Sequence, residues 1–130
     1  MTLHNTPVRT TVLLMESKPE VRTGVSAVLN KAGFNVIATE SPREAWTILE
    51  AQSDVRVLLA DLDVSDPTDG LELARKVHDR WPSLGLVMTS EQIRHLRPSD
   101  IPGDGCFLPR PLPTETLLQE VALAADRMAA

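Results

Sequence analysis

VRVLLADLDVSDPTDGLEL, residues 55–73, is the stretch of sequence that decides the fold. Its first six residues are almost continuously apolar and do not alternate, which is typical of a strand covered by helices on both faces. An Asp-Gly pair follows and opens a pattern of apolar residues at helical spacing from Gly70 to Trp81. A buried strand followed by such a helix predicts an α/β fold with a parallel sheet.

Similar strands and helices alternate along the rest of the chain. We expect strands at Thr11–Met15, Phe34–Thr39, Val55–Ala60, Leu84–Thr89 and Cys106–Pro109. We expect helices at Pro19–Ala32, Pro42–Ala51, Gly70–Trp81 and Thr114–Ala129. This alternation predicts an open parallel sheet with helices on both faces, joined by right-handed crossovers.

Side chains that can cap a helix precede three of these helices. Ser17 and Ser41 are each followed three residues later by a glutamate, which is the pattern of a capping box. Asp69 is expected to cap the third helix.

The segment 90–105 has the weakest pattern. We expect a short helix over Glu91–Leu96 and then an irregular loop, because the prolines at positions 98 and 102 cannot continue a helix. Residues 1–10 are expected to form a flexible tail, which leaves residues 11–130 as one domain.

Composition excludes several classes of protein. The 130 residues carry a formal net charge of −5, which disfavours sequence-independent binding of nucleic acid. The single cysteine, Cys106, cannot form an internal disulfide, and no apolar run approaches the roughly 20 residues that span a bilayer. Neither a signal peptide nor a Gly-rich phosphate loop is visible. We therefore expect a cytoplasmic protein without nucleic-acid or membrane partners.

Polar side chains follow the predicted strands where parallel strands of an open sheet bind ligands, at their carboxyl ends. These residues are Glu16, Ser17, Asp61, Asp63, Thr89, Ser90, Glu91 and Arg110. Carboxylate oxygens suit Mg²⁺, and a hydroxyl with a cation opposite them suits phosphate. The arrangement indicates phosphoryl chemistry with Asp61 as a candidate nucleophile, while the side chain of Asp63 is expected to face solvent.

The chain resembles the receiver domain of bacterial response regulators over about residues 11–129. The resemblance rests on VLLMESKPEVR at 12–22, VRVLLADLDVSDPTDGLEL at 55–73, LGLVMTS at 84–90 and CFLPRPLPTETLLQEV at 106–121. It implies a flavodoxin-like (βα)₅ sandwich with strand order 2-1-3-4-5 and, in this chain, a short or irregular fourth helix. It also implies a stand-alone receiver similar to the chemotaxis regulators.

The resemblance assigns roles to single residues. It implies that Asp61 accepts a phosphoryl group from a sensor histidine kinase or a phosphotransfer protein. Mg²⁺ would be held by Glu16, Asp61 and the backbone carbonyl of Asp63, with Ser17 at a further ligand position. Thr89 and Phe107 stand at the switch positions, and Arg110 stands where the family has a lysine.

Two departures from the family pattern leave two hypotheses open. Ser17 stands where the family has an acidic metal ligand. Arg110 stands where the family has a lysine, so a planar guanidinium replaces a compact ammonium on a flexible side chain. In the first hypothesis the chain is phosphorylated on Asp61 with Mg²⁺, and phosphorylation switches the surface that binds a downstream effector. Its own catalytic activity is then at most a self-phosphorylation from a phosphodonor. In the alternative it is a pseudo-receiver that docks partners independently of phosphate, with Arg110 in a fixed ion-pair network. A homodimer stays open in both.

Overall fold

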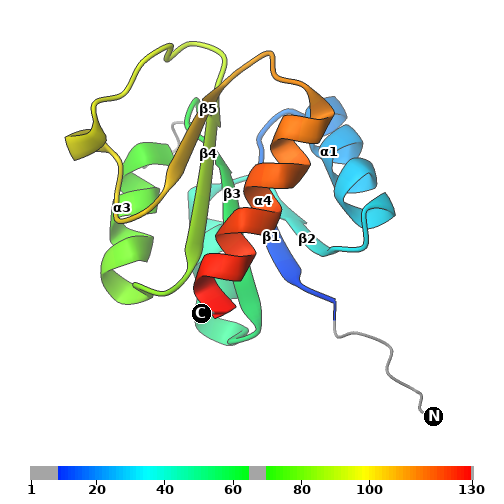
Figure 1. Cartoon of the computed structure of the whole chain (residues 1–130). Helices are drawn as coiled ribbons and strands as arrows, with labels where there is room; N and C mark the ends of the chain where they lie inside the picture. Colours follow the sequence, from blue (N-terminus) through cyan, green and yellow to red (C-terminus); the bar gives the residue numbers. More distant parts are fainter. Residues whose placement is uncertain (1–8, 65–69, 130) are drawn as a thin grey trace.

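Five parallel strands form one sheet in the order β2-β1-β3-β4-β5, within the residues that the computed structural model describes, 9–64 and 70–129 (Figure 1). The strands are β1 Thr11–Met15, β2 Asn35–Thr39, β3 Val55–Asp61, β4 Gly85–Ser90 and β5 Cys106–Pro109. The helices are α1 Pro19–Lys31, α2 Pro42–Ala51, α3 Gly70–Arg80 and α4 Thr114–Ala129, with a 3₁₀ turn at Pro98–Asp100. This order of parallel strands confirms the flavodoxin-like prediction.

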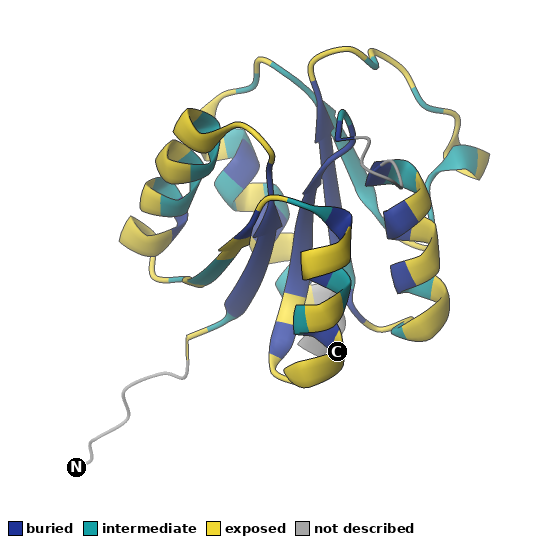
Figure 2. Cartoon of the chain, turned by 180° about the vertical axis from the view of Figure 1, so that it is seen from behind, coloured by how far each residue is buried: buried dark blue, intermediate teal, exposed yellow. Residues whose placement is uncertain are grey.

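Two hydrophobic cores lie on opposite faces of the sheet. One core packs α1 and α4 against the sheet through residues such as Leu29 and Val121. The other packs α2 and α3 through Leu49 and Val77. The central strands are buried on both faces, which explains their continuous apolar runs (Figure 2). No helix in the described part of the chain is long and apolar enough to cross a membrane.

The predicted bounds hold to within one residue, and the differences lie at the ends of elements. β3 and β4 each extend one residue further, so that Asp61 and Ser90 are inside the sheet. β2 and β4 begin one residue later than expected, and α1 and α3 end one residue earlier. Residues 1–8 of the expected tail lie outside the described residues, and the Thr10 carbonyl accepts a hydrogen bond from the Asn35 amide.

One predicted helix cap is wrong and one is confirmed. Lys18, not Ser17, precedes the first residue of α1 and makes no cap with its side chain. The reason is Pro19, which keeps the residue before it extended and so fixes the helix start after Lys18. Ser41 does cap α2, since its hydroxyl accepts from the Glu44 amide at 3.2 Å. Asp69 lies outside the described residues.

The segment between β4 and β5 contains no α-helix, so the short helix predicted over Glu91–Leu96 is wrong. Arg97 is extended because Pro98 follows it, which leaves too few residues after β4 for a stable helix. Pro98 instead begins the 3₁₀ turn. Ile93, Leu96 and Ile101 still pack against the core on the α2–α3 face.

Candidate functional site

The carboxyl ends of β1, β3 and β4 bring the predicted polar residues to one edge of the sheet. Asp61 and Thr89 are paired neighbours in the β3–β4 ladder, and the Leu62 amide donates to the Thr89 carbonyl at 2.8 Å. Glu16 follows β1 directly, and its amide donates to the Thr39 carbonyl of β2 at 2.9 Å. Glu16, Asp61 and Thr89 are all buried, so the sheet fixes their backbones and the surrounding core excludes most water from their side chains.

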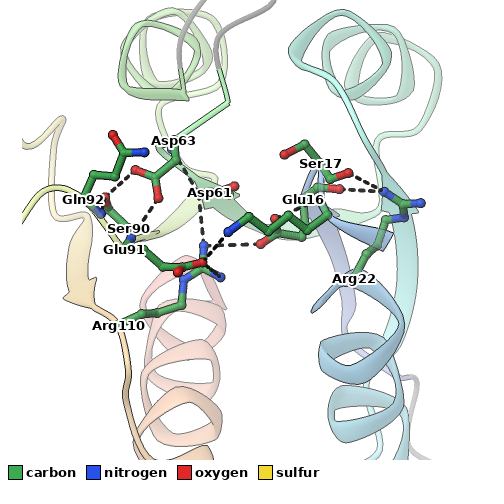
Figure 3. Close-up of polar contacts among 10 residues, drawn as sticks. Glu16, Ser17, Arg22, Asp61, Asp63, Ser90, Glu91, Gln92 and Arg110 are labelled. Carbon is green, nitrogen blue, oxygen red and sulfur yellow. Dashed lines mark hydrogen bonds and ion pairs between the residues drawn. The ribbon is translucent and has the colours of Figure 1, made fainter. Parts of the chain in front are cut away.

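A single arginine joins the two buried carboxylates (Figure 3). Arg110 follows β5, and its Nη2 atom lies 3.0 Å from Asp61 Oδ1 and 3.3 Å from Glu16 Oε1. The side chains are 15% exposed for Arg110, 3% for Asp61 and 4% for Glu16. Such burial is tolerated only because the charges are paired.

A second, exposed ion pair borders this cluster. The Lys18 ammonium lies 2.8 Å from Glu91 Oε1, and Arg110 Nη1 lies 3.9 Å from the same oxygen. Lys18 precedes α1 and Glu91 follows β4, so the pair connects opposite sides of the site. Because both side chains are about half exposed, water screens this contact far more than the buried one.

Asp63 connects the loop after β3 to the end of β4. Its carboxylate accepts from the Ser90 hydroxyl and, at 2.8 Å, from the Glu91 amide. The Ser90 hydroxyl in turn accepts from the amides of Gln92 and Ile93, at 3.1 and 2.7 Å. The expectation that the Asp63 side chain faces solvent is therefore wrong, because the free amides after β4 offer it better partners (Figure 3).

Arg22 of α1 holds the turn after β1. Its Nη1 atom donates to the Glu16 carbonyl at 2.8 Å and to the Ser17 carbonyl at 3.4 Å (Figure 3). Ser17 itself is exposed. The Glu16 carboxylate is fixed from the other side, where its Oε2 accepts from the Lys18 amide at 3.2 Å.

The acid strength of Glu16 is altered by this environment. Burial is the largest cause and raises the pKa of Glu16 above its ordinary value of 4.5. The neighbouring charge of Asp61 raises the pKa further, while the hydrogen bond from the Lys18 amide and the charge of Arg110 oppose the shift. The site therefore resists having two full negative charges side by side.

Gly70 places α3 in direct contact with the backbone of the site. A Cβ atom at this position would lie 2.4 Å from the Asp61 carbonyl oxygen and 2.6 Å from Leu62 Cα. Only a glycine therefore allows the first turn of α3 to approach the end of β3 this closely. The Asp-Gly pair in the sequence indicated a helix start, but it did not reveal this contact.

A cavity of about 650 Å³ opens from the site toward the gap between α1 and α4. Asp61, Thr89 and Arg110 line one end of it, and apolar side chains of the two helices line the other. Phe107, the other predicted switch residue, is not in this wall. It lies half-buried on β5 and packs against the core of the α2–α3 face.

Comparison with known proteins identifies the family. The model of the response regulator receiver domain matches residues 12–121. The chain belongs to this family. Receiver domains act in two-component phosphorelay signalling, where they interact with histidine kinases or phosphotransfer proteins and with effectors. The relatives support this function over the docking-only alternative.

Individual relatives show how far the similarity extends. This receiver domain is 28% identical over 116 residues to the sensor protein TorS of Escherichia coli K12, and it is 26% identical over 84 residues to the chemotaxis protein CheY1 of Helicobacter pylori J99. The alignments cover 85% and 62% of this chain. They cover 12% of TorS and 67% of CheY1, so this chain spans about an eighth of TorS.

Solved structures share the fold. A response regulator receiver protein from Sinorhizobium medicae WSM419 superposes with a TM-score of 0.85 at 22% identity, covering 93% of this chain and 98% of that one. The CheY4 chemotaxis regulator of Vibrio cholerae superposes with a TM-score of 0.78 at 20% identity, covering 90% of this chain and 99% of that one.

Receiver domains generally bind Mg²⁺ at acidic residues, but here both oxygens of Glu16 and one oxygen of Asp61 are already engaged. Arg110 occupies the space between the Glu16 and Asp61 carboxylates, and the second oxygen of Glu16 accepts from Lys18. Ser17 offers a hydroxyl where a carboxylate is expected, and it is exposed. Mg²⁺ needs several oxygens in near-octahedral geometry, so this arrangement does not fit the ion.

Proposed function

We propose that this receiver domain accepts a phosphoryl group on Asp61. The observation that carries the proposal is the contact of the Arg110 guanidinium with the buried Asp61 carboxylate, 3.0 Å from Oδ1, at the carboxyl edge of the sheet. A fixed cation beside a nucleophilic oxygen stabilises the charge that develops on a transferring phosphoryl group. Thr89, the neighbour of Asp61 in the ladder, brings a hydroxyl to the same edge.

The transfer is a displacement at phosphorus. Asp61 Oδ2, which takes neither the hydrogen bond from Arg110 nor that from the Asp63 amide, attacks the phosphorus of a phosphohistidine or a small acyl phosphate. The new O–P bond makes Asp61 an acyl phosphate. The N–P or O–P bond of the donor breaks, and its electron pair stays with the imidazole nitrogen or the carboxylate that leaves. A sensor histidine kinase or a phosphotransfer protein is the proposed donor in the cytoplasm.

The signal then passes to an effector through the elements beside the site. Thr89 turns its hydroxyl toward the phosphoryl oxygens, and Phe107 repacks against the α2–α3 core, where it lies with Ile93 and Ile101. The segment 91–105, between β4 and β5, packs next to that core where the family fold has its fourth helix. We propose that this segment and β5 form the surface that changes on phosphorylation.

Mass spectrometry after incubation with acetyl phosphate tests this function. We expect a mass gain of one phosphoryl group that hydroxylamine removes, as it removes acyl phosphates. Asp61→Asn should abolish the gain, whereas Asp63→Asn should retain it, which identifies the reactive carboxylate. Reactions run both with Mg²⁺ and with EDTA keep the test independent of the metal. The absence of a phosphoryl adduct under both conditions contradicts the proposal.

A further inference from the structure

We propose that Arg110 supplies the positive charge of the acceptor site, so that Asp61 is phosphorylated without a divalent metal. This inference rests on the proposed function and specifies its chemistry. Arg110 Nη2 lies within hydrogen-bonding distance of both buried carboxylates, 3.0 Å from Asp61 Oδ1 and 3.3 Å from Glu16 Oε1. The guanidinium therefore occupies the point where the acidic oxygens converge.

The oxygens around this point, apart from Asp61 Oδ2, have other partners. Glu16 Oε2 accepts from the Lys18 amide, and Asp61 Oδ1 accepts from the Asp63 amide at 3.0 Å. The Asp63 carboxylate accepts from Ser90 and Glu91. A divalent cation would have to displace the guanidinium from two buried carboxylates and lie beside its charge. Both steps cost free energy, and the other carboxylates of the site, Asp63 and Glu91, already have partners.

The backbone of Arg110 is held so that its side chain points into the site. Its amide donates to the Ser90 carbonyl at 2.8 Å, and its carbonyl accepts from the Arg94 guanidinium. The peptide bond to Pro111 is cis. These contacts fix the residue from β4 and from the segment after it, so the guanidinium acts as a preorganised charge.

The guanidinium also keeps donors for phosphoryl oxygens. Nη2 makes the two short contacts with the carboxylates, whereas Nη1 lies 3.9 Å from Glu91 Oε1, beyond hydrogen-bonding distance. Nε is buried and has no hydrogen-bond partner among the described residues. The planar fork of an arginine matches the spacing of two phosphoryl oxygens, which a lysine ammonium cannot do.

The charges of the site are consistent with this role. Glu16, Asp61 and Glu91 contribute three negative charges, and Arg110 and Lys18 contribute two positive charges, which leaves a net charge of −1 on these five side chains. An incoming phosphoryl donor is itself an anion. The two cations reduce the repulsion that the carboxylates would otherwise impose on it.

The rate of phosphorylation by acetyl phosphate, measured with Mg²⁺ and with excess EDTA, tests the inference. We expect the two rates to agree within about twofold for the wild type. We expect Arg110→Ala to lower the rate about a hundredfold under both conditions, because the developing charge loses its fixed donor. The double variant Ser17→Asp/Arg110→Lys restores the usual metal site and should become dependent on Mg²⁺, even if Arg110→Ala fails to fold.

A titration of the wild type with MgCl₂, followed through the amide NMR signals of residues 16, 61 and 63, provides a readout that does not need activity. We expect no saturable shift in the wild type and a saturable shift in the double variant. A wild-type rate that falls more than about tenfold in EDTA, or a saturable Mg²⁺ shift, overturns the inference. The absence of any phosphorylation in both buffers overturns the proposed function instead, and the titration still decides the metal question.

Discussion

Burial makes the negative charge on Glu16 unfavourable and raises its pKa above the ordinary value of 4.5. A raised pKa means that the folded protein binds the proton more tightly than the unfolded chain does. Between 4.5 and the raised pKa, the folded state therefore holds more protons, and the contribution of Glu16 to stability decreases as the pH rises.

Replacing Glu16 by glutamine should remove this pH dependence. We expect the difference in unfolding free energy, wild type minus Glu16→Gln, to become more negative as the pH rises from 4.5 upward and then to level off. Urea denaturation at a series of pH values measures it. Glu20→Gln, on the exposed surface of α1, is the matched control for the loss of one carboxylate outside the site. A difference that grows more positive with pH contradicts the expected sign.

Gly70 gives a second prediction for a single residue. We expect Gly70→Ala to lower the unfolding free energy by about 1–3 kcal/mol, because its Cβ would overlap the Asp61 carbonyl oxygen. The displaced end of β3 should also slow phosphorylation of Asp61. Urea denaturation and the acetyl phosphate reaction measure the two effects.

Gly24 is the control for Gly70, because a Cβ there meets no atom within 4 Å. Gly24→Ala, in the interior of α1, should raise the unfolding free energy by about 0.5–1 kcal/mol. Equal effects of the two alanines would falsify the view that close approach to Asp61 is what requires glycine at position 70.

Among the elements, the segment 91–105 departs most from the sequence-based expectation, because the short helix expected over Glu91–Leu96 is absent. Its start is held by side chains: the Ser90 hydroxyl accepts from the amides of Gln92 and Ile93 and donates to Asp63. Its continuation is set by Pro98, which keeps Arg97 extended. The segment is therefore ordered by specific hydrogen bonds and by the packing of a few apolar side chains, and regular backbone pairing contributes little.

Ser90→Ala should loosen this segment. The substitution removes three hydrogen bonds from a fully buried hydroxyl, and we expect a loss of about 1–3 kcal/mol of unfolding free energy. Hydrogen exchange should accelerate at the amides of Gln92 and Ile93. Ser41→Ala removes the cap of α2, should cost about 1 kcal/mol, and should leave these two amides unchanged. Undiminished protection at both amides in Ser90→Ala would show that other contacts hold the segment.

The sequence predicted the fold well because continuous apolar strands and helical periodicity are local signals that the parallel sheet makes consistent. It also predicted which residues gather at the carboxyl edge, since topology alone determines that. It could not predict the partners of Asp63, and it offered the ion pairs of Arg110 with Glu16 and Asp61 only as one of two hypotheses. These contacts depend on loop conformations and on which of several nearby donors pairs with each carboxylate. A periodic sequence pattern encodes neither.

At the scale of the whole molecule, burial decreases from the centre of the sheet to its edges. Every residue of β3 except Arg56 is buried, whereas all four residues of β5 are only half-buried (Figure 2). β5 has a hydrogen-bonded neighbour on one side only. Since Arg110 directly follows β5, a half-buried edge strand carries the cation of the acceptor site.

Native-state hydrogen exchange should reflect this gradient. We expect the amides of β1 and β3 to exchange only through global unfolding, and those of β5 to exchange through a local opening of lower free energy. The same opening withdraws Arg110 from Asp61, so phosphorylation of Asp61 should strengthen the protection of β5 by adding a partner for the guanidinium. If the amides of β5 are as well protected as those of β3 in the free protein, β5 does not open locally and the prediction is wrong.

The contact between two indole rings has an optical consequence. The rings of Trp46 and Trp81 are in tilted contact, with centroids 4.8 Å apart and planes at 58°, and the chain contains no tyrosine. The near-ultraviolet circular dichroism spectrum is therefore dominated by this one pair of tryptophans. The intrinsic fluorescence comes from the same pair. Trp81 follows α3 at the end away from Gly70. These spectra therefore report on a part of the α2–α3 face that lies away from the start of α3. They follow unfolding of the α2–α3 face, where both indole rings pack against the core.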